Sequence, residues 1–393
     1  MVAAMIATGY FYTGRETMAL EMAEGIAEGA LRYVPEVDWI AGLSAWNLGE
    51  FETALTHFER FAEAEGISDR ERAAASFWTA RANLVTRRPE NVLPWLQRAA
   101  QVPYTLYGIL AGRQLGLSPG LDWGPPSVSG AEVAVLQGVP AIRRAIALTQ
   151  IGNDHMADQE IRAVYSAAGF GISKPLLAVA SQYGMASAEL RISRQVLALD
   201  GEAFNGSLYP VPNWQPDGGF DLDRALVFAF VRQESAFNIR ARSVDGAHGL
   251  MQLMPSTAAF VTGDSSLRGK NSDKLYEQDF NLSLGQQYLQ ILMDTDHVGS
   301  NLVWMVAAYN GGPGNLSKWM RAMGPAEDPL IFMEKIPVRE TREFVERVLT
   351  NLWMYRARLG QDSPELDALA SGAWPQYQSV DGIRQTAFRD AGN

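Results

Sequence analysis

Apolar residues recur at helical spacing through the first hundred positions of the chain. Residues 14–20 can be laid over residues 49–55, an offset of 35, and residues 26–28 then fall over residues 61–63. A looser third copy runs from 78 to 99. This period is close to that of tetratricopeptide repeats, so the pattern predicts stacked helix hairpins. Three unrelated amphipathic helices are the alternative, and both interpretations make the region α-helical.

Two stretches rich in glycine and proline interrupt the helical pattern, at 115–126 and 209–219. Neither can continue a helix, so each predicts a linker or a domain edge. Between them, Val135, Val139, Ile142 and Ile146 keep helical spacing over roughly 130–200, and Pro140 predicts a kink or a helix boundary. No convincing run of alternating residues indicates a strand. The sequence therefore predicts a mainly all-α fold.

Length and composition narrow the classes of protein. A chain of 393 residues indicates two or three domains. The net charge of −11 and the sequence pI of about 5.0 argue against a nucleic-acid partner, which would need a basic surface. The absence of cysteine excludes disulfides and thiolate chemistry. The four histidines are scattered without metal-ligand spacing, so we expect no metal: His57, His155, His248 and His297.

The hydrophobic pattern also bears on whether the chain crosses a membrane. No stretch approaches 18 consecutive apolar residues, which predicts no membrane span. The first seven residues are mildly apolar but lack a basic leader, so they do not match an intact signal peptide. If the protein works outside the cytoplasm, we expect this sequence to be a processed or truncated form.

The segment from Asp221 to Phe237 is the first with chemical character. Asp221 or Asp223 can cap a helix, and Leu226, Phe230 and Glu234 then follow at i, i+4 and i+8. This spacing predicts Glu234 on the apolar face, near the helix C-terminus. Desolvation and the helix dipole there both raise a carboxyl pKa, as a general acid near neutral pH needs. Taken alone, a glutamate at a helix end is more often simply solvated.

Two further stretches add candidate groups for binding. Ser235 directly follows the glutamate, and residues 246–255 form a glycine-bearing turn with an amide side chain and apolar residues. Residues 307–314 place Tyr309 and Asn310 at a glycine-rich helix end. An aromatic ring and amide groups suit a sugar groove. A buried loop and a helix C-cap are the structural alternative for either stretch by itself.

Together, in this order, four stretches closely resemble the soluble lytic transglycosylase family: residues 232–237 (RQESAF), 249–255 (GLMQLMP), 308–312 (AYNGG) and 336–345 (IPVRETREFV). The resemblance is strong over about 210–360 and softer over the N-terminal region, where family members carry an α-superhelical arm. It implies a helical-repeat superhelix followed by a lysozyme-like α-helical catalytic domain. We therefore expect a TPR-like region at 1–116, a helical linker domain at 127–205, the catalytic domain at 206–365 and a C-terminal tail at 366–393.

The resemblance also implies roles for single residues. Glu234 matches the sole catalytic residue of the family, and Ser235 completes its Glu-Ser pair. The other matching positions are expected to bind the glycan or to line its groove: Ser243, Gly249, Met251, Gln252, Met254, Tyr309, Asn310 and Phe344. Phe344 is a departure, since relatives usually have tyrosine there. The ring is kept but the hydroxyl is lost, which puts efficiency in doubt more than the class of reaction.

By resemblance the substrate is the glycan strand of peptidoglycan, and no cofactor or metal is needed. One glutamate first protonates the bond between N-acetylmuramic acid and N-acetylglucosamine, then deprotonates the 6-hydroxyl as a 1,6-anhydro ring closes. We expect a periplasmic location, and the helical arm is a candidate contact for cell-wall synthesis or secretion proteins.

Two other functions stay open at this point. A second carboxylate would favour hydrolysis, as in a goose-type lysozyme-like enzyme, and the candidates are Asp245, Glu277 and Asp279. Alternatively, the chain is an inactive scaffold that only grips glycan. An acid kept on an apolar face argues against a scaffold, because its burial costs stability.

Overall fold

The computed structural model describes residues 2–26, 33–117, 120–325 and 327–381. Helices dominate this part of the chain, and it contains isolated β-bridges but no strand, so the predicted all-α class is confirmed. The chain packs into two compact units. The first comprises 1–119, 292–350 and 363–378, and the second comprises 120–291, 351–362 and 379–393.

The helices of the first unit come from three parts of the sequence. They are α1 (Val2–Tyr12), α2 (Glu16–Glu24), α4 (Glu36–Leu48), α5 (Phe51–Glu63), α6 (Asp69–Val85), α7 (Pro89–Ala100), α8 (Leu106–Gln114), α18 (Leu302–Gly311), α19 (Pro313–Met323), α20 (Pro329–Lys335) and α22 (Pro364–Ala370). Two longer helices, α17 (Gln278–Met293) and α21 (Arg339–Arg358), contribute residues to each unit.

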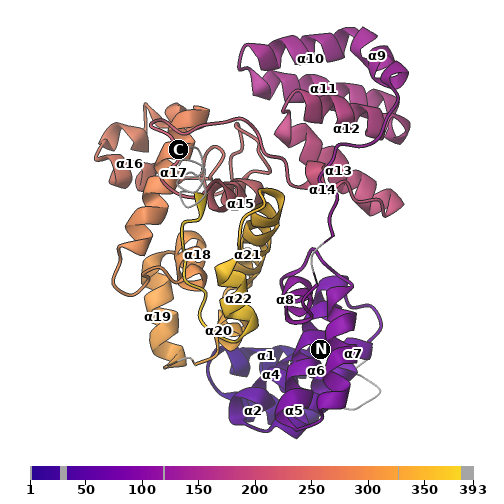
Figure 1. Cartoon of the computed structure of the whole chain (residues 1–393). Coiled ribbons are helices and arrows are strands. Elements are labelled where there is room, and N and C mark those ends of the chain that lie inside the picture. The colour runs from indigo at the N-terminus through magenta and orange to yellow at the C-terminus, as the bar shows by residue number, and fades with distance from the viewer. Residues whose placement is uncertain (1, 27–32, 118–119, 326, 382–393) are drawn as a thin grey trace, which may run out of the picture. The chain divides into compact units, whose positions relative to one another are not determined.

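Helices α1 to α8 form hairpins in which each helix packs on the next along the chain (Figure 1). The start of α6 shows how the sequence sets a boundary, because Ser68 and Glu71 form a reciprocal capping box. Gly42 of α4 allows close packing, since an added Cβ would lie 2.5 Å from the Phe58 ring. The matched stretches 14–20 and 49–55 fall at the starts of α2 and α5, and positions 27 and 28 of the repeat lie outside the described residues.

An aromatic cluster fills the space between these hairpins. Trp78 is fully buried, and its ring lies within 5.2–6.3 Å of those of Trp46, Phe58 and Trp39. The Arg81 guanidinium lies 4.8 Å from the Trp46 ring and 4.4 Å from the Trp78 ring, and it also bonds Asp328 at 2.6 Å. The ion pair thus links α6 to the residue that caps α20, and the cation–π contacts hold the guanidinium against the aromatic cluster.

A second polar centre of the first unit lies among α6, α8, α20 and α21. Arg70 binds the buried Glu346 carboxylate through two hydrogen bonds of 2.8 and 2.9 Å. The Tyr107 hydroxyl donates to the neighbouring carboxyl of Glu334. Burial, and then the charge of Glu346, raise the pKa of Glu334 to about 7. This centre borders a cavity of about 490 Å³ in the same unit.

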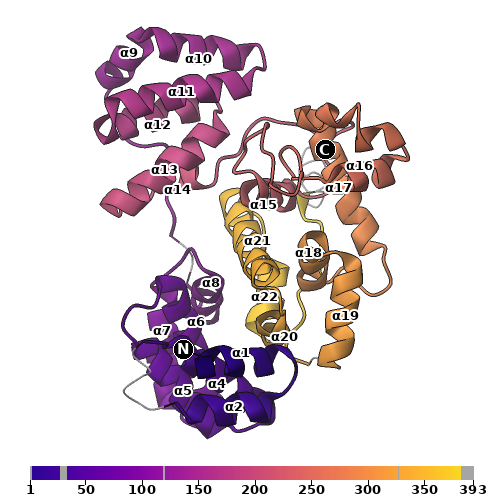
Figure 2. The same ribbon diagram turned by 180° about the vertical axis from the view of Figure 1, so that it is seen from behind.

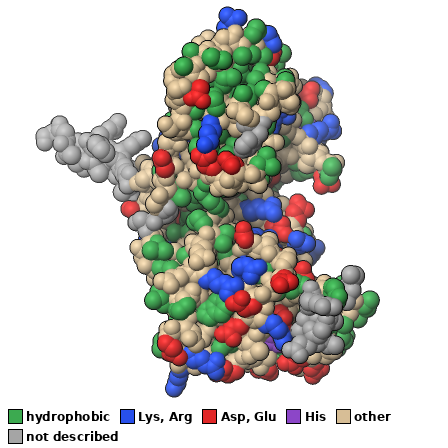
Figure 3. Space-filling view, turned by 90° about the vertical axis from the view of Figure 1, so that its right-hand side faces the viewer, with side chains coloured by type: hydrophobic (Ala, Val, Ile, Leu, Met, Phe, Trp, Pro, Cys, Tyr) green, Lys and Arg blue, Asp and Glu red, His purple; other side chains and the backbone are tan. Residues whose placement is uncertain are grey.

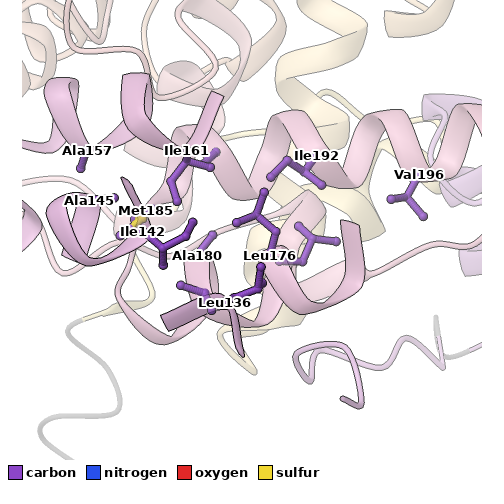
Figure 4. Packing of buried hydrophobic residues seen from close by; sticks show 13 residues of the cluster. Leu136, Ile142, Ala145, Ala157, Ile161, Leu176, Ala180, Met185, Ile192 and Val196 are labelled. Atoms are coloured by element: carbon purple, nitrogen blue, oxygen red, sulfur yellow. The ribbon is translucent and has the colours of Figure 1, made fainter. Parts of the chain in front are cut away.

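The second unit holds the remaining elements. They are α9 (Gly130–Gly138), α10 (Pro140–Gln150), α11 (Asp154–Ala168), α12 (Ser173–Gln182), α13 (Ala186–Asp200), α14 (Asn205–Leu208), α15 (Arg224–Glu234) and α16 (Pro255–Thr262), with short 3₁₀ turns η1 (Phe170–Ile172), η2 (Ser265–Arg268) and η3 (Ser272–Tyr276). Helices α9 to α13 stack on one another (Figure 2). Their shared core includes Ile142, Ile161, Leu176 and Ile192 (Figure 4).

The predicted interruptions of the helical pattern are confirmed. No α-helix lies between the end of α8 at 114 and the start of α9 at 130, apart from the undescribed residues 118 and 119. None lies between α14 and α15, over residues 209–223. Pro140 is the first residue of α10, where its missing N–H costs no helical hydrogen bond. The domain boundaries predicted from the sequence stay a prediction, and residues 382–393 of the predicted tail lie outside the described residues.

Charged side chains of both signs lie on the surface. On the face in Figure 3, basic and acidic side chains lie close to one another. Within the described ranges, no helix is both long and apolar enough to cross a lipid bilayer.

The raised pKa of Glu334 predicts how stability depends on pH. Its pKa of about 7 lies above the ordinary 4.5, so the folded state holds the proton more tightly than the unfolded state. The resulting stabilisation is complete below about pH 4.5 and is lost as pH rises through about 7. We expect Glu334→Gln to flatten the fall in urea midpoint between about pH 5 and pH 8. The exposed control Glu65→Gln should keep the wild-type profile. A Glu334→Gln profile as steep as that of the wild type would contradict this assignment.

Candidate active site

Helix α15 carries Glu234 as its last residue. Every residue from Ala225 to Val231 is buried, so the helix is embedded on all sides rather than on one apolar face. Glu234 itself is half-buried. The second part of α21 supports this helix, because the Asn351 side chain accepts from Arg232 at 2.6 Å and donates to the Ala229 carbonyl at 3.2 Å. A buried and well-supported helix therefore fixes where Glu234 lies in the fold.

The start of α15 differs from the capping predicted for it. Asp223 occupies the N-cap position, but its side chain makes no cap hydrogen bond. Its fully buried carboxylate instead pairs with the equally buried Arg356 at 3.2 Å. It also accepts from Ser379 and from the backbone of Val380 and Asp381. Tertiary pairing with a buried arginine takes precedence over the local cap here, because an unpaired buried charge is far more costly.

The chain turns sharply just after Glu234. The Ser235 N–H and hydroxyl both donate to the Val231 carbonyl, each at 3.1 Å. Ala236 and Phe237 then adopt left-handed backbone angles, with φ of 49° and 64°. Such angles are rare for residues with a Cβ and persist only where the surroundings hold them. The Glu234-Ser235 pair is thus built into a strained helix end.

Residues 241–253 form a compact loop through hydrogen bonds to their own backbone. The Ser243 hydroxyl accepts from the Ala247 N–H at 2.9 Å. The Ala241 carbonyl accepts both from the Gly249 N–H at 2.9 Å and from the Gln252 side chain at 3.1 Å. Gln252 also donates to the Gly249 carbonyl at 2.8 Å. The amide nitrogen of Gln252 therefore holds the loop, and so does the Ser243 hydroxyl.

The two methionines of this loop differ in exposure. Met251 has no exposed surface, its sulfur packs against Gly285, and its N–H donates to Asn281 at 2.8 Å. Met254 is 38% exposed and precedes α16. A contribution of Met251 to binding would therefore come through the shape of the loop, whereas Met254 offers an apolar surface.

Three of the expected site residues belong to the first unit. Tyr309 and Asn310 lie in the last turn of α18, at the glycine-rich end expected from the sequence. The rings of Tyr309 and Phe344 are stacked, with centroids 6.4 Å apart and planes 5° from parallel. The Thr341 hydroxyl donates to the Asn310 side-chain oxygen at 2.6 Å. Residues of the 336–345 stretch thus orient both side chains of the 308–312 stretch.

The sequence pattern did not reveal the residues that support these positions. Asn281 is fully buried, and its amide also donates to the carbonyls of His248 and Leu275, at 3.1 and 2.8 Å. Nothing about an isolated asparagine in α17 distinguishes it from a surface polar residue. Thr341 lies within a recognised stretch, but only the fold shows its contact with Asn310.

The remaining acids and the histidine of this region have simpler settings. The candidate second carboxylates Asp245, Glu277 and Asp279 are all exposed. Burial lowers the pKa of His248, which packs on Tyr276 with ring centroids 5.0 Å apart. Across the part of the chain that the structure describes, no three acidic or histidine side chains come together in a way that could hold a metal ion.

Residues 216–331 match the family model described as the transglycosylase SLT domain. The chain therefore carries an SLT domain, and the resemblance inferred from the four stretches is confirmed. Soluble lytic murein transglycosylase of Escherichia coli (strain K12) is 37% identical over 149 residues, which are 38% of this chain and 23% of that protein. The match thus spans about a quarter of the length of that relative.

Two solved structures resemble the chain over most of its length. The lytic transglycosylase Slt of Pseudomonas aeruginosa matches with a TM-score of 0.71 and 22% identity, covering 92% of this chain and 58% of that one. The 70 kDa soluble lytic transglycosylase of Escherichia coli matches with a TM-score of 0.69 and 22% identity, covering 96% and 64%. At this identity the likeness shows a shared fold.

The packing of Gly249 makes a testable prediction about the loop. Its φ is +79°, and an added Cβ would lie 2.2 Å from the Leu275 carbonyl oxygen and 2.4 Å from the Asn281 amide. Gly246 has a φ of +89° but nothing within 4 Å of that position. We expect Gly249→Ala to cost about 2–5 kcal/mol of unfolding free energy through overpacking and strain. Gly246→Ala should cost only about 1–2 kcal/mol. Equal costs in urea unfolding would contradict the predicted close approach.

Proposed function

We propose that this protein is a peptidoglycan lytic transglycosylase. It cleaves the β-1,4 bond between N-acetylmuramic acid and N-acetylglucosamine without water and leaves 1,6-anhydro-N-acetylmuramic acid ends. The observation that carries the proposal is the placement of Glu234, followed by Ser235, at the end of a buried helix inside the segment that matches the SLT domain. A relative that is 37% identical over 149 residues is named for the same activity.

A single carboxyl group is enough for the proposed reaction. Glu234 donates its proton to the glycosidic oxygen, and the bond from that oxygen to C1 of N-acetylmuramic acid breaks. The resulting carboxylate then takes the proton of the 6-hydroxyl, whose oxygen forms the new bond to C1. The acid is thereby restored, and the atoms of the strand are conserved. General acid–base catalysis supplies about 10²–10⁴-fold, so positioning of the sugar must supply much of the rest.

The remaining residues divide into glycan contacts and supports. We assign contact to side chains with exposed or half-exposed surface: Met254, Gln252, Tyr309 and Asn310. Ser243, Gly249 and Met251 hold the loop that presents them. Phe344 has no hydroxyl, so its part is the ring that stacks on Tyr309. Ser235 is half-buried, and we keep it as the partner of Glu234 in the Glu-Ser pair that the resemblance implies.

The setting of the protein belongs to the same proposal. We place the protein in the periplasm, with peptidoglycan glycan strands as its substrate. The helices of residues 1–116 form an arm that is available to bind cell-wall synthesis or secretion proteins. The predicted linker domain at 127–205 and catalytic domain at 206–365 complete this organisation.

A lysozyme-like hydrolase is the alternative enzyme. It would need a second carboxylate to activate water. Asp245, Glu277 and Asp279 are exposed, which favours a role in solubility over one in a desolvated site. An inactive scaffold is the alternative of another class, and it predicts that Glu234 is dispensable.

Removal of the proton donor tests the proposal. Glu234→Gln keeps the size of the side chain but cannot donate and recover a proton, so release of soluble fragments from purified sacculi should fall at least about 10²-fold. Asp245→Asn and Asp279→Asn are matched carboxyl-to-amide controls in the same unit and should retain the wild-type rate. Equal clearance of sacculi by wild type and Glu234→Gln would rule out this mechanism and leave the scaffold.

A further inference from the structure

The turn that follows Glu234 needs an outside support. Ala236 and Phe237 are consecutive residues with left-handed backbone angles, and both carry a Cβ. An isolated chain would leave this conformation, because the steric cost falls on each residue. The last residue of a helix also frays readily unless the chain beyond it is held. Whatever holds Phe237 therefore also holds the backbone of Glu234.

Phe237 is held by two aromatic neighbours. Its side chain is 1% exposed, and its ring centroid lies 6.2 Å from that of Phe228 in α15 and 5.8 Å from that of Trp214. Phe228 belongs to the same helix as Glu234 and can fix the turn only relative to α15. Trp214 lies before α15, in the glycine- and proline-rich stretch, and it supports the turn from outside the helix.

Trp214 is in turn anchored by the stack of helices α9 to α13. It is only 9% exposed, and its indole N–H donates to the Asp154 carboxylate at 3.1 Å. Asp154 is the first residue of α11. The space around this contact is small, a cavity of about 20 Å³ lined also by Phe237, Asn238 and Ile239 of the turn. The turn therefore packs closely on the helices behind it.

Those helices provide a firm base for the contact. Ala157 and Ile161, one and two turns beyond Asp154 in α11, are buried in a core shared with α10, α12 and α13 (Figure 4). Met185, which borders the small cavity, belongs to the same core. Asp154 and Trp214 both lie outside the segment 216–331 that matches the SLT domain.

We propose that Trp214, anchored by Asp154, is a positioning residue that sets the left-handed turn after Glu234 and so fixes the proton donor for catalysis. This inference rests on the proposed function. It gives the helices of residues 127–205 a task in the reaction: they brace the end of α15 from outside the SLT domain. The indole ring supplies the wall for Phe237, and the hydrogen bond to Asp154 fixes that wall in place.

A graded series of substitutions tests the proposal on soluble peptidoglycan fragments. Trp214→Ala removes the wall and should lower kcat about 10–100-fold with little change in KM, because a displaced proton donor slows the chemical step more than binding. Trp214→Phe keeps a ring without the N–H, and its kcat should lie between those of the wild type and Trp214→Ala. Asp154→Asn keeps an acceptor oxygen and should retain most of the wild-type kcat, whereas Asp154→Ala should resemble Trp214→Phe.

A matched control separates positioning from general destabilisation. Leu176→Ala removes a fully buried side chain from the α9–α13 core that does not line the small cavity beside the turn, so it should lower the unfolding midpoint but leave kcat per folded molecule unchanged. The titration of the Glu234 carboxyl, followed by ¹³C NMR and assigned with Glu234→Gln, gives a readout that is independent of turnover. The midpoint of this titration should shift in Trp214→Ala and should not shift in Leu176→Ala.

Two outcomes overturn the inference. One is a Trp214→Ala protein whose kcat and Glu234 titration equal those of the wild type. The other is a loss of activity that merely follows the unfolded fraction, as in Leu176→Ala. If the wild type itself released no fragments, the proposed function would fail. The NMR titration would then still decide whether Trp214 positions Glu234.

Discussion

A buried ion pair fixes the helix on which the candidate chemistry depends. Asp223 and Arg356 are both fully buried, and the same carboxylate binds Ser379 and the backbone at 380 and 381. Loss of either partner would leave a charge stranded in the interior, at a cost of about 3–5 kcal/mol. The start of α15 is thereby tied to α21 and to a segment near the end of the described chain. Its buried middle transmits this constraint to Glu234.

The far end of α15 is fixed by different physics. Backbone strain at Ala236 and Phe237 is offset by aromatic packing, and the loop that follows is held by the buried amide of Asn281 and by Gly249. In the first unit, Thr341 and Phe344 orient Asn310 and Tyr309. Four of the residues that match the family hold others in place: Ser243, Gly249, Met251 and Phe344. Such rigid support is what a site built for positioning requires.

The parts of this structure that follow from local chemistry could be predicted from the sequence. Glycine and proline density marked both interruptions, Pro140 marked the start of α10, and helical spacing gave the all-α class. Local chemistry offers Asp221 or Asp223 as the cap of α15, whereas Arg356, the partner of Asp223, lies far along the chain. Asn281 and Trp214 were missed for the same reason. The residues that are adjacent in the sequence do not show which distant side chain will be the hydrogen-bond partner.

In the proposed reaction, one carboxyl group breaks the glycan strand and the sugar's own hydroxyl takes the place of water. Mass spectrometry of the fragments released from purified sacculi, in water enriched with ¹⁸O, tests this most directly. We expect 1,6-anhydro ends that carry no ¹⁸O, with a mass about 20 Da below that of the same fragment hydrolysed in H₂¹⁸O. New reducing ends, which only attack of water at C1 can form, would contradict the proposed reaction.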